Sequence, residues 1–181
     1  MQHTYDTIWQ CANYEEESFS GMRDKDFGGG AGSLKLSRTA MVAAIYAAMT
    51  IALAPISFGP LQFRAAEAMT VLPCVYPEAV PGLFIGCLIA NLIGGYGIAD
   101  IVFGSLATLA AAYMSRRMKQ IWLVPLPPVI VNALVIGAVL SKMLGLPFWL
   151  TAGEICLGQT GACYGLGIPL LLFLKRRKIS L

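Results

Sequence analysis

Charged residues are scarce in this chain. Asp, Glu, Lys and Arg make up 13% of its 181 residues, whereas hydrophobic residues make up 57%. Soluble domains carry about 25% charged and about 45–50% apolar residues, and the mean hydropathy of +0.68 points the same way. The composition is typical of a membrane protein, and the length predicts one compact helical bundle. Nothing in it indicates a nucleic-acid-binding groove.

Residues that build common catalytic and metal sites are also few. His3 is the single histidine, and no two of the five cysteines form a CxxC pair. We therefore expect no metal site and interpret the cysteines as small hydrophobic residues. The glycine-rich stretch GGGAGSLKLS lacks the spacing of a GxxxxGK[ST] phosphate loop. We expect no enzyme and no cofactor, so any energy source must belong to a partner protein.

The N-terminal region differs from the rest of the chain. Residues 1–36 are polar and end in a run of glycines, which predicts a flexible tail ahead of a membrane domain at residues 37–181. The first 30 residues hold no hydrophobic h-region, so we do not interpret them as a signal peptide.

Apolar stretches separated by turn residues predict an all-α membrane protein, a bundle of six transmembrane helices. The expected spans are residues 39–56, 66–80, 81–94, 99–115, 121–144 and 150–174. The second and third are each shorter than the roughly 20 residues that cross a bilayer, so the alternative is one kinked helix and five spans.

Basic residues favour six spans. They cluster before the first span, after the fourth and after the last: Lys35 and Arg38; Arg116, Arg117 and Lys119; Lys175, Arg176, Arg177 and Lys178. With six spans all three clusters lie on one side of the membrane, as the positive-inside rule requires. Both termini are then cytoplasmic.

Small residues mark the first span. Ala40, Ala44 and Ala48 recur every fourth residue, with Ala43 and Ala47 on an adjoining stripe. Such stripes let another helix approach closely. One interpretation is packing inside the bundle, and the other is a docking face for a second protein; the two stripes allow both.

Polar side chains inside the apolar stretches are the candidate binding residues, since a charge at membrane depth costs about 2.5–3.5 kcal/mol on insertion scales. The candidates are Arg64, Glu67, Asn91, Asp100, Asn132, Glu154 and Gln159. In the six-span topology they converge on the outer half of the bundle, whereas Glu78 faces the cytoplasm. The alternative is separate roles, with charges that snorkel to water and Asp100 as a helix cap. Convergence favours a polar pocket open to the outside, in a substrate-capturing subunit driven by a partner.

Four blocks of sequence carry a resemblance to a known family: LAPISFGPLQFRAAEAMTVLP, PGLFIGCLIANLIGG, GIADIVFGSLATLAA and PPVIVNALVIG. Over about residues 36–174 the chain resembles the QueT family, substrate-binding S components of energy-coupling factor (ECF) transporters. The resemblance implies the six-helix S-component fold in a bacterial cell membrane. The implied ligand is a queuosine precursor, a 7-deazaguanine such as preQ1 or queuine.

The resemblance also implies a partner, the ECF module of a transmembrane coupling protein and two ATPases. Members of the family dock on the coupling protein through an AxxxA motif on the first helix. Ala40, Ala44 and Ala48 match it, and so do Ala43 and Ala47, which leaves the register open.

The chemistry of a 7-deazaguanine suggests roles for the candidate residues. Its guanine-type edge offers two adjacent donors to one carboxylate, for which we expect Glu154. An aminomethyl ammonium would take a second carboxylate, either Glu67 or Asp100. Candidate donors to the carbonyl of the base are Asn132, Gln159 and Arg64, and candidate stacking partners are Phe63, Tyr96 and Trp149. An alternative interpretation of Arg64 is a pair with Glu67 that holds the first loop as a lid. The alternative functions are binding of another vitamin-like molecule and a membrane scaffold without transport.

Overall fold

The computed structural model describes residues 30–57, 62–95 and 97–177, and all regular secondary structure in these ranges is helical. The elements are α3 (Gly30–Ala52), α4 (Ala54–Ser57), η1 (Ala65–Cys74), α5 (Ala79–Gly94), η2 (Asp100–Gly104), α6 (Ser105–Arg116), α7 (Leu126–Leu144), α8 (Phe148–Thr160), η3 (Gly161–Gly167) and α9 (Ile168–Arg177). Here η1 is a 3-10 helix, and η2 and η3 are π-helical. The prediction of an all-α protein is confirmed.

Three helical stretches of the described chain are long and apolar enough to cross a membrane: Gly32–Ala52, Leu126–Leu144 and Phe148–Leu174. The segments η1 and α5 are apolar but shorter. Large hydrophobic side chains cover much of the outside, among them Ile98, Leu157 and Ile93, as a lipid environment requires. The chain is therefore a membrane protein, and the count of six spans stays a prediction.

The first predicted span is divided into two helices. Helix α3 begins at Gly30, earlier than the predicted Thr39, and ends at Ala52; the short α4 follows it. Pro55 explains the break, because proline has no N–H to donate and its ring clashes with the preceding turn. Helix α3 thus includes the end of the predicted tail, and residues 1–29 lie outside the described residues.

Helices α3 and α5 pack closely because two glycines of α5 face α3. A Cβ atom on Gly82 would lie 2.7 Å from the Thr39 carbonyl oxygen, and one on Gly86 would lie 2.7 Å from that of Ala43. Ala43 and Ala47 are consequently buried in this contact. The other alanine stripe, Ala40, Ala44 and Ala48, remains exposed.

The second predicted span is the 3-10 helix η1, which ends at Cys74 with Pro73 inside it. All ten of its residues are buried, and it packs against α3, α6 and η3. Small residues permit this position: a Cβ on Gly167 of η3 would lie 3.2 Å from the Ala68 carbonyl oxygen. The segment η1 therefore runs through the interior of the bundle.

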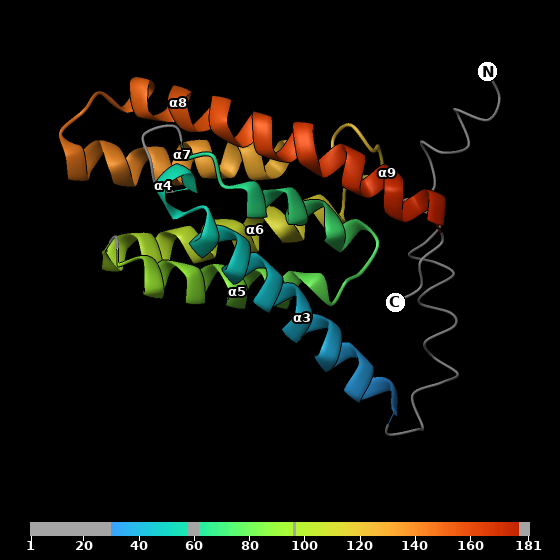
Figure 1. Cartoon of the computed structure of the whole chain (residues 1–181). Coiled ribbons are helices and arrows are strands. Elements are labelled where there is room, and N and C mark those ends of the chain that lie inside the picture. The colour runs from blue at the N-terminus through green and yellow to red at the C-terminus, as the bar shows by residue number, and fades with distance from the viewer. Residues whose placement is uncertain (1–29, 58–61, 96, 178–181) are drawn as a thin grey trace, which may run out of the picture.

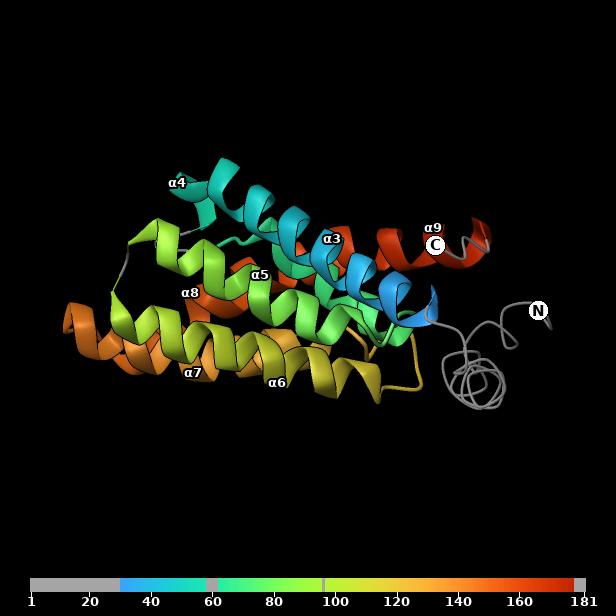
Figure 2. The same ribbon diagram turned by 90° about the horizontal axis from the view of Figure 1, so that it is seen from below.

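The two ends of the bundle differ in charge. Figures 1 and 2 show that α3 starts, and α6 and α9 end, at the same end of the bundle. The three basic clusters of the sequence belong to these helix ends. The opposite end holds α4 and the turns that follow α5 and α7.

Candidate ligand-binding site

The 3-10 geometry of η1 collects polar side chains on one edge. A 3-10 helix has three residues per turn, so side chains at i and i+3 eclipse each other. Arg64, the N-cap of η1, shares this edge with Glu67 and Thr70. Ala65, Ala68, Met69 and Leu72 occupy the other two edges, which are apolar. The segment therefore presents one polar edge to the interior.

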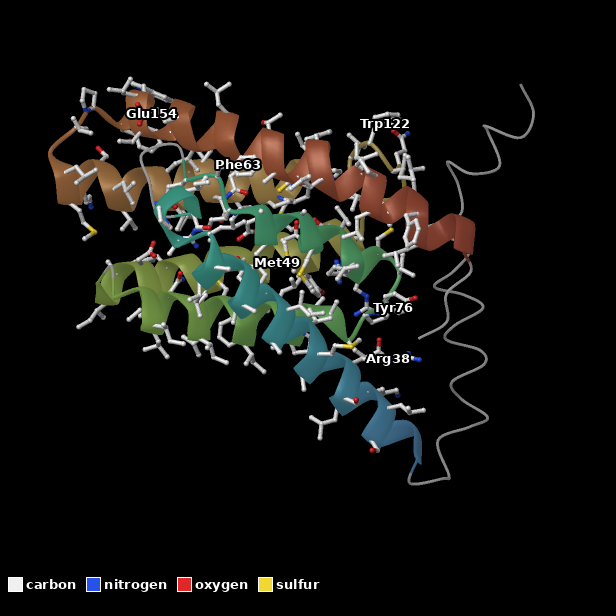
Figure 3. The ribbon with its side chains drawn as sticks, in the orientation of Figure 1. Arg38, Met49, Phe63, Tyr76, Trp122 and Glu154 are labelled. Atoms are coloured by element: carbon white, nitrogen blue, oxygen red, sulfur yellow. The ribbon has the colours of Figure 1, made fainter. Side chains whose placement is uncertain are left out.

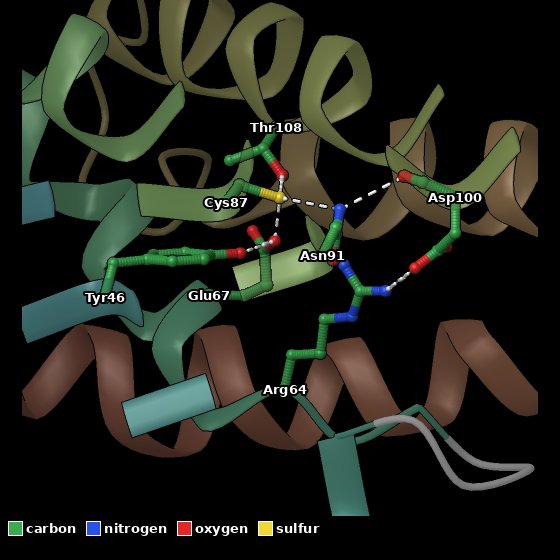
Figure 4. A network of polar contacts seen from close by, with 7 residues as sticks. All are labelled: Tyr46, Arg64, Glu67, Cys87, Asn91, Asp100 and Thr108. Carbon is green, nitrogen blue, oxygen red and sulfur yellow. Dashed lines mark hydrogen bonds and ion pairs between the residues drawn. The ribbon is translucent and has the colours of Figure 1, made fainter. Parts of the chain in front are cut away.

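Glu67 is completely buried, and two hydroxyl groups donate hydrogen bonds to one of its carboxylate oxygens. The Tyr46 hydroxyl of α3 lies 2.6 Å from Oε1, and Thr108 Oγ1 of α6 lies 3.1 Å from the same atom (Figure 4). The second oxygen, Oε2, has no hydrogen-bond partner among the described residues. One carboxylate oxygen of Glu67 is thus fixed by two hydrogen bonds, and the other can accept a further hydrogen bond.

Arg64 and Asp100 form a buried ion pair across the bundle. Arg64 Nη2 lies 3.1 Å from Asp100 Oδ2, and both side chains are almost fully buried. The chain turns sharply ahead of Arg64, because Gln62 has a positive φ of 44° and its carbonyl oxygen accepts the Arg64 N–H at 2.8 Å. Such a conformation costs a non-glycine residue of the order of 1–3 kcal/mol, and backbone strain of this kind clusters at functional sites.

Asp100 begins the π-helical segment η2, and Asn91 of α5 is fixed against it. Asn91 Nδ2 donates to the Asp100 carbonyl oxygen at 3.1 Å and to Cys87 Sγ at 3.4 Å. Gly104 makes room for this amide, since a Cβ there would lie 2.8 Å from Asn91 Nδ2. Short π-helical insertions occur often at functional sites, because they shift side chains out of the regular helical register.

Asn132 and Gln159, two more of the predicted site residues, are buried. Asn132 of α7 is buried one turn before Ile136, whose Cδ1 lies 3.7 Å from the Cβ position of Gly104. Gln159 of α8 is buried as well. Cys163 Sγ lies 3.6 Å from Gln159 Oε1 and 3.6 Å from the Glu67 carbonyl oxygen, and so links α8 to η1.

Other predicted site residues lie elsewhere. Glu154 is only partly buried on α8 and lies outside the hydrogen-bonded network of Figure 4. Phe63 is half-buried, with its Cε2 atom 3.1 Å from the Cβ position of Gly161. Trp149 is 82% exposed, as suits an interfacial anchor. Tyr96 lies outside the described residues.

Sequence reasoning missed four members of the network: Tyr46, Cys87, Thr108 and Cys163. Cys87 accepts hydrogen bonds from Thr108 and Asn91, so it does more than fill space. One signal was present for Tyr46, since it is a lone polar aromatic residue in an alanine-rich helix. Another was the spacing of three from Arg64 to Glu67 to Thr70.

Unpartnered polar atoms accompany this network. Glu67 Oε2, Asn91 Oδ1, Ser105 Oγ and Asn132 Nδ2 are buried without a hydrogen-bond partner in the described chain. Leaving such an atom unsatisfied costs about 1–3 kcal/mol. Buried donors and acceptors without a protein partner are expected where a small polar molecule binds. In the same ranges, no group of three or more His, Cys, Asp or Glu side chains is placed to hold a metal ion.

Helices long and apolar enough to cross a membrane, together with a buried polar network, define the class of this chain, a membrane protein with a polar site in its interior. The family follows from comparison with known proteins. The model of the QueT transporter family matches residues 36–176, and the chain belongs to this family. The resemblance carried by the four sequence blocks is thereby confirmed.

A relative from Lactococcus lactis subsp. cremoris (strain MG1363) is named "Queuosine precursor transporter QueT". It is 35% identical over 72 residues, which cover 39% of this chain and 42% of the relative. No solved structure matches the chain. The family consists of transporters, which agrees with the prediction of a non-enzymatic protein with a small-molecule ligand.

Proposed function

We propose that this chain is the substrate-binding subunit of an ECF transporter and captures a 7-deazaguanine precursor of queuosine, preQ1 or queuine. Family membership and the name of the relative support this proposal. The main structural support for a ligand site is that the Glu67 carboxylate is completely buried and one of its oxygens has no hydrogen-bond partner among the described residues.

We propose different roles for the acidic residues, in keeping with their hydrogen-bond partners. Glu67 Oε1 already accepts two hydrogen bonds, so Glu67 accepts one more donor through Oε2, and an ammonium group fits this position. The guanine-type edge needs both oxygens of one carboxylate, for which we propose Glu154. Asp100 is held by Arg64 and serves to position the loop before η1. Asn91, Asn132 and Gln159 supply the remaining polar contacts.

The partner in this proposal is the ECF module, a coupling protein with two ATPases. The exposed stripe of Ala40, Ala44 and Ala48 is the proposed docking face, because Ala43 and Ala47 are buried and Ala43 packs against Gly86 of α5. The basic helix ends gathered at one end of the bundle support an orientation with both termini in the cytoplasm. In a chain of six spans with this orientation, the proposed site takes its ligand from the exterior.

Two ligands that differ in one group test the site. PreQ1 and 7-cyano-7-deazaguanine share the base, but only preQ1 carries an ammonium. Titration of the detergent-purified chain should show that Glu67→Gln weakens preQ1 binding about 10- to 100-fold, the value of one charged hydrogen bond. Binding of the cyano compound should stay within about threefold of the parent chain. Glu154→Gln should weaken both ligands.

Glu78→Gln is the matched control, since Glu78 lies at the basic end of the bundle and is only partly buried. Equal preQ1 affinity of the Glu67→Gln and parent chains would reject the role of Glu67. Binding of a vitamin with no response to either deazaguanine would reject the ligand, and the polar network would then serve another S-component substrate.

A further inference from the structure

A cavity lies against the apolar edges of η1, away from the edge that carries Glu67. It is a groove of about 450 Å³ between α3, η1 and the η3–α9 segment. Its walls are aliphatic, with Met41 and Ile45 from α3, Leu72 from η1, and Leu166 from η3. Among the described residues that line it, only Arg38 and Tyr76 have polar side chains. Such a groove suits a hydrocarbon chain and not a nucleobase.

The groove opens to the outside of the bundle. Met41, Ile45 and Leu166 on its rim are 42%, 44% and 46% exposed. Residues 32–52 of α3, which form one wall, belong to a stretch that is apolar enough to cross a membrane. The opening therefore faces the acyl region of the bilayer.

The length of the groove matches one leaflet. Along α3 it extends from Arg38 to Met49, eleven steps along the helix, or about 16.5 Å at the helical rise of 1.5 Å per residue. Half of a hydrocarbon core is about 15 Å thick. Figure 3 shows Arg38 and Tyr76 near one end of the groove and Met49 farther along α3, toward the middle of the bundle. The groove has the reach of a single acyl chain.

The polar end of the groove is cationic. The Arg38 guanidinium carbon lies 5.9 Å above the Tyr76 ring centroid, which holds the side chain at the mouth of the groove. Lys35 lies one turn earlier on the same helix. A guanidinium binds phosphate through paired N–H donors, and a cation at the mouth favours a headgroup with net negative charge.

We propose that this groove binds one anionic phospholipid, with an acyl chain along α3 and η1 and the phosphate on Arg38. The site is separate from the ligand site, because the two lie on different edges of η1. The proposal stands independently of the substrate that the chain carries.

Native mass spectrometry of the full chain tests it. The protein is released from micelles that contain equal amounts of phosphatidylglycerol and phosphatidylcholine with identical acyl chains. The parent chain should retain one phosphatidylglycerol molecule. Arg38→Gln should lower the phosphatidylglycerol-to-phosphatidylcholine ratio of the adducts at least fivefold, and Ile45→Trp, which fills the groove, should remove both adducts.

The chain offers matched controls for both variants. Arg117 also stands over a tyrosine, 4.7 Å from the Tyr113 ring centroid, at the same end of the bundle but away from the groove. Leu106 of α6 is 50% exposed, a fraction similar to the 44% of Ile45. Arg117→Gln and Leu106→Trp should leave the retained lipid unchanged.

Three outcomes would overturn the proposal. Equal lipid ratios for Arg38→Gln and Arg117→Gln would remove the headgroup contact. Full retention of lipid by Ile45→Trp would remove the groove as the site. If the parent chain forms a dimer and Ile45→Trp abolishes it, the groove binds a second copy of the chain and not a lipid.

Discussion

Buried charged residues have a large effect on the stability of this protein, because no water surrounds their charges. Arg64 and Asp100 are 3% and 5% exposed, so each charge depends on the other. Removing one partner of a buried pair typically costs about 3–5 kcal/mol, whereas replacing both by apolar residues is often close to neutral. The pair therefore acts as a unit that joins the start of η1 to the start of η2.

Asp100→Asn should lower the apparent Tm of the detergent-purified chain by about 10 °C, because it leaves the Arg64 charge without its carboxylate. The double variant Arg64→Met/Asp100→Leu should recover most of this loss. Thermal unfolding of the parent chain, Arg64→Met, Asp100→Leu and the double variant gives the coupling between the two positions. Glu78→Gln should change the Tm little. An Asp100→Asn protein as stable as the parent chain would contradict the role of this ion pair.

At the scale of the helix, α3 has two faces with different partners. Gly82 and Gly86 of α5 select the Ala43 and Ala47 face for packing. The Ala40, Ala44 and Ala48 face is left at the surface. One alanine stripe of α3 thus packs inside the bundle, and the other is the proposed docking face.

Ala44→Leu and Ala47→Leu should give opposite results. Ala47→Leu overpacks the contact with α5 and should destabilise the chain by about 1–3 kcal/mol, measured by thermal unfolding. Ala44→Leu should leave the Tm and preQ1 binding unchanged but prevent copurification with the ECF module. Copurification of Ala44→Leu at the level of the parent chain would contradict docking through the exposed stripe.

At the scale of the molecule, the charges of the helix ends define a direction. The basic clusters meet at one end of the bundle, and positive charge is retained on the cytoplasmic side of membrane proteins. The Glu67 network lies between this end and the turns at the other. Orientation therefore decides from which side the substrate enters.

Cysteine labelling measures this orientation. Leu146, in the turn after α7, and Lys119, in the connection after α6, are both exposed and lie at opposite ends. Leu146→Cys should react with a membrane-impermeant maleimide on intact cells, and Lys119→Cys only after permeabilisation. The parent chain sets the background of its own five cysteines. The reverse pattern would place both termini outside.

Many residues of the site could be predicted from the sequence, but their arrangement in space could not. Arg64, Glu67, Asn91 and Asp100 stand out in the sequence because charge and amide groups are costly in an apolar segment. Their partners do not stand out. Tyr46 and Thr108 are distant from Glu67 in sequence, and a threonine or tyrosine in an apolar helix has many ordinary roles.

The sequence by itself determined the helical class, the approximate limits of the apolar stretches and the family, since hydropathy, proline breaks and sequence blocks are local properties. Only the tertiary structure decided that AAEAMTVLPC is a 3-10 helix, because its neighbours confine it on every side. The structure alone decided which alanine stripe of α3 is covered and which carboxylate keeps an unpartnered oxygen. Those choices depend on contacts between segments far apart in the chain.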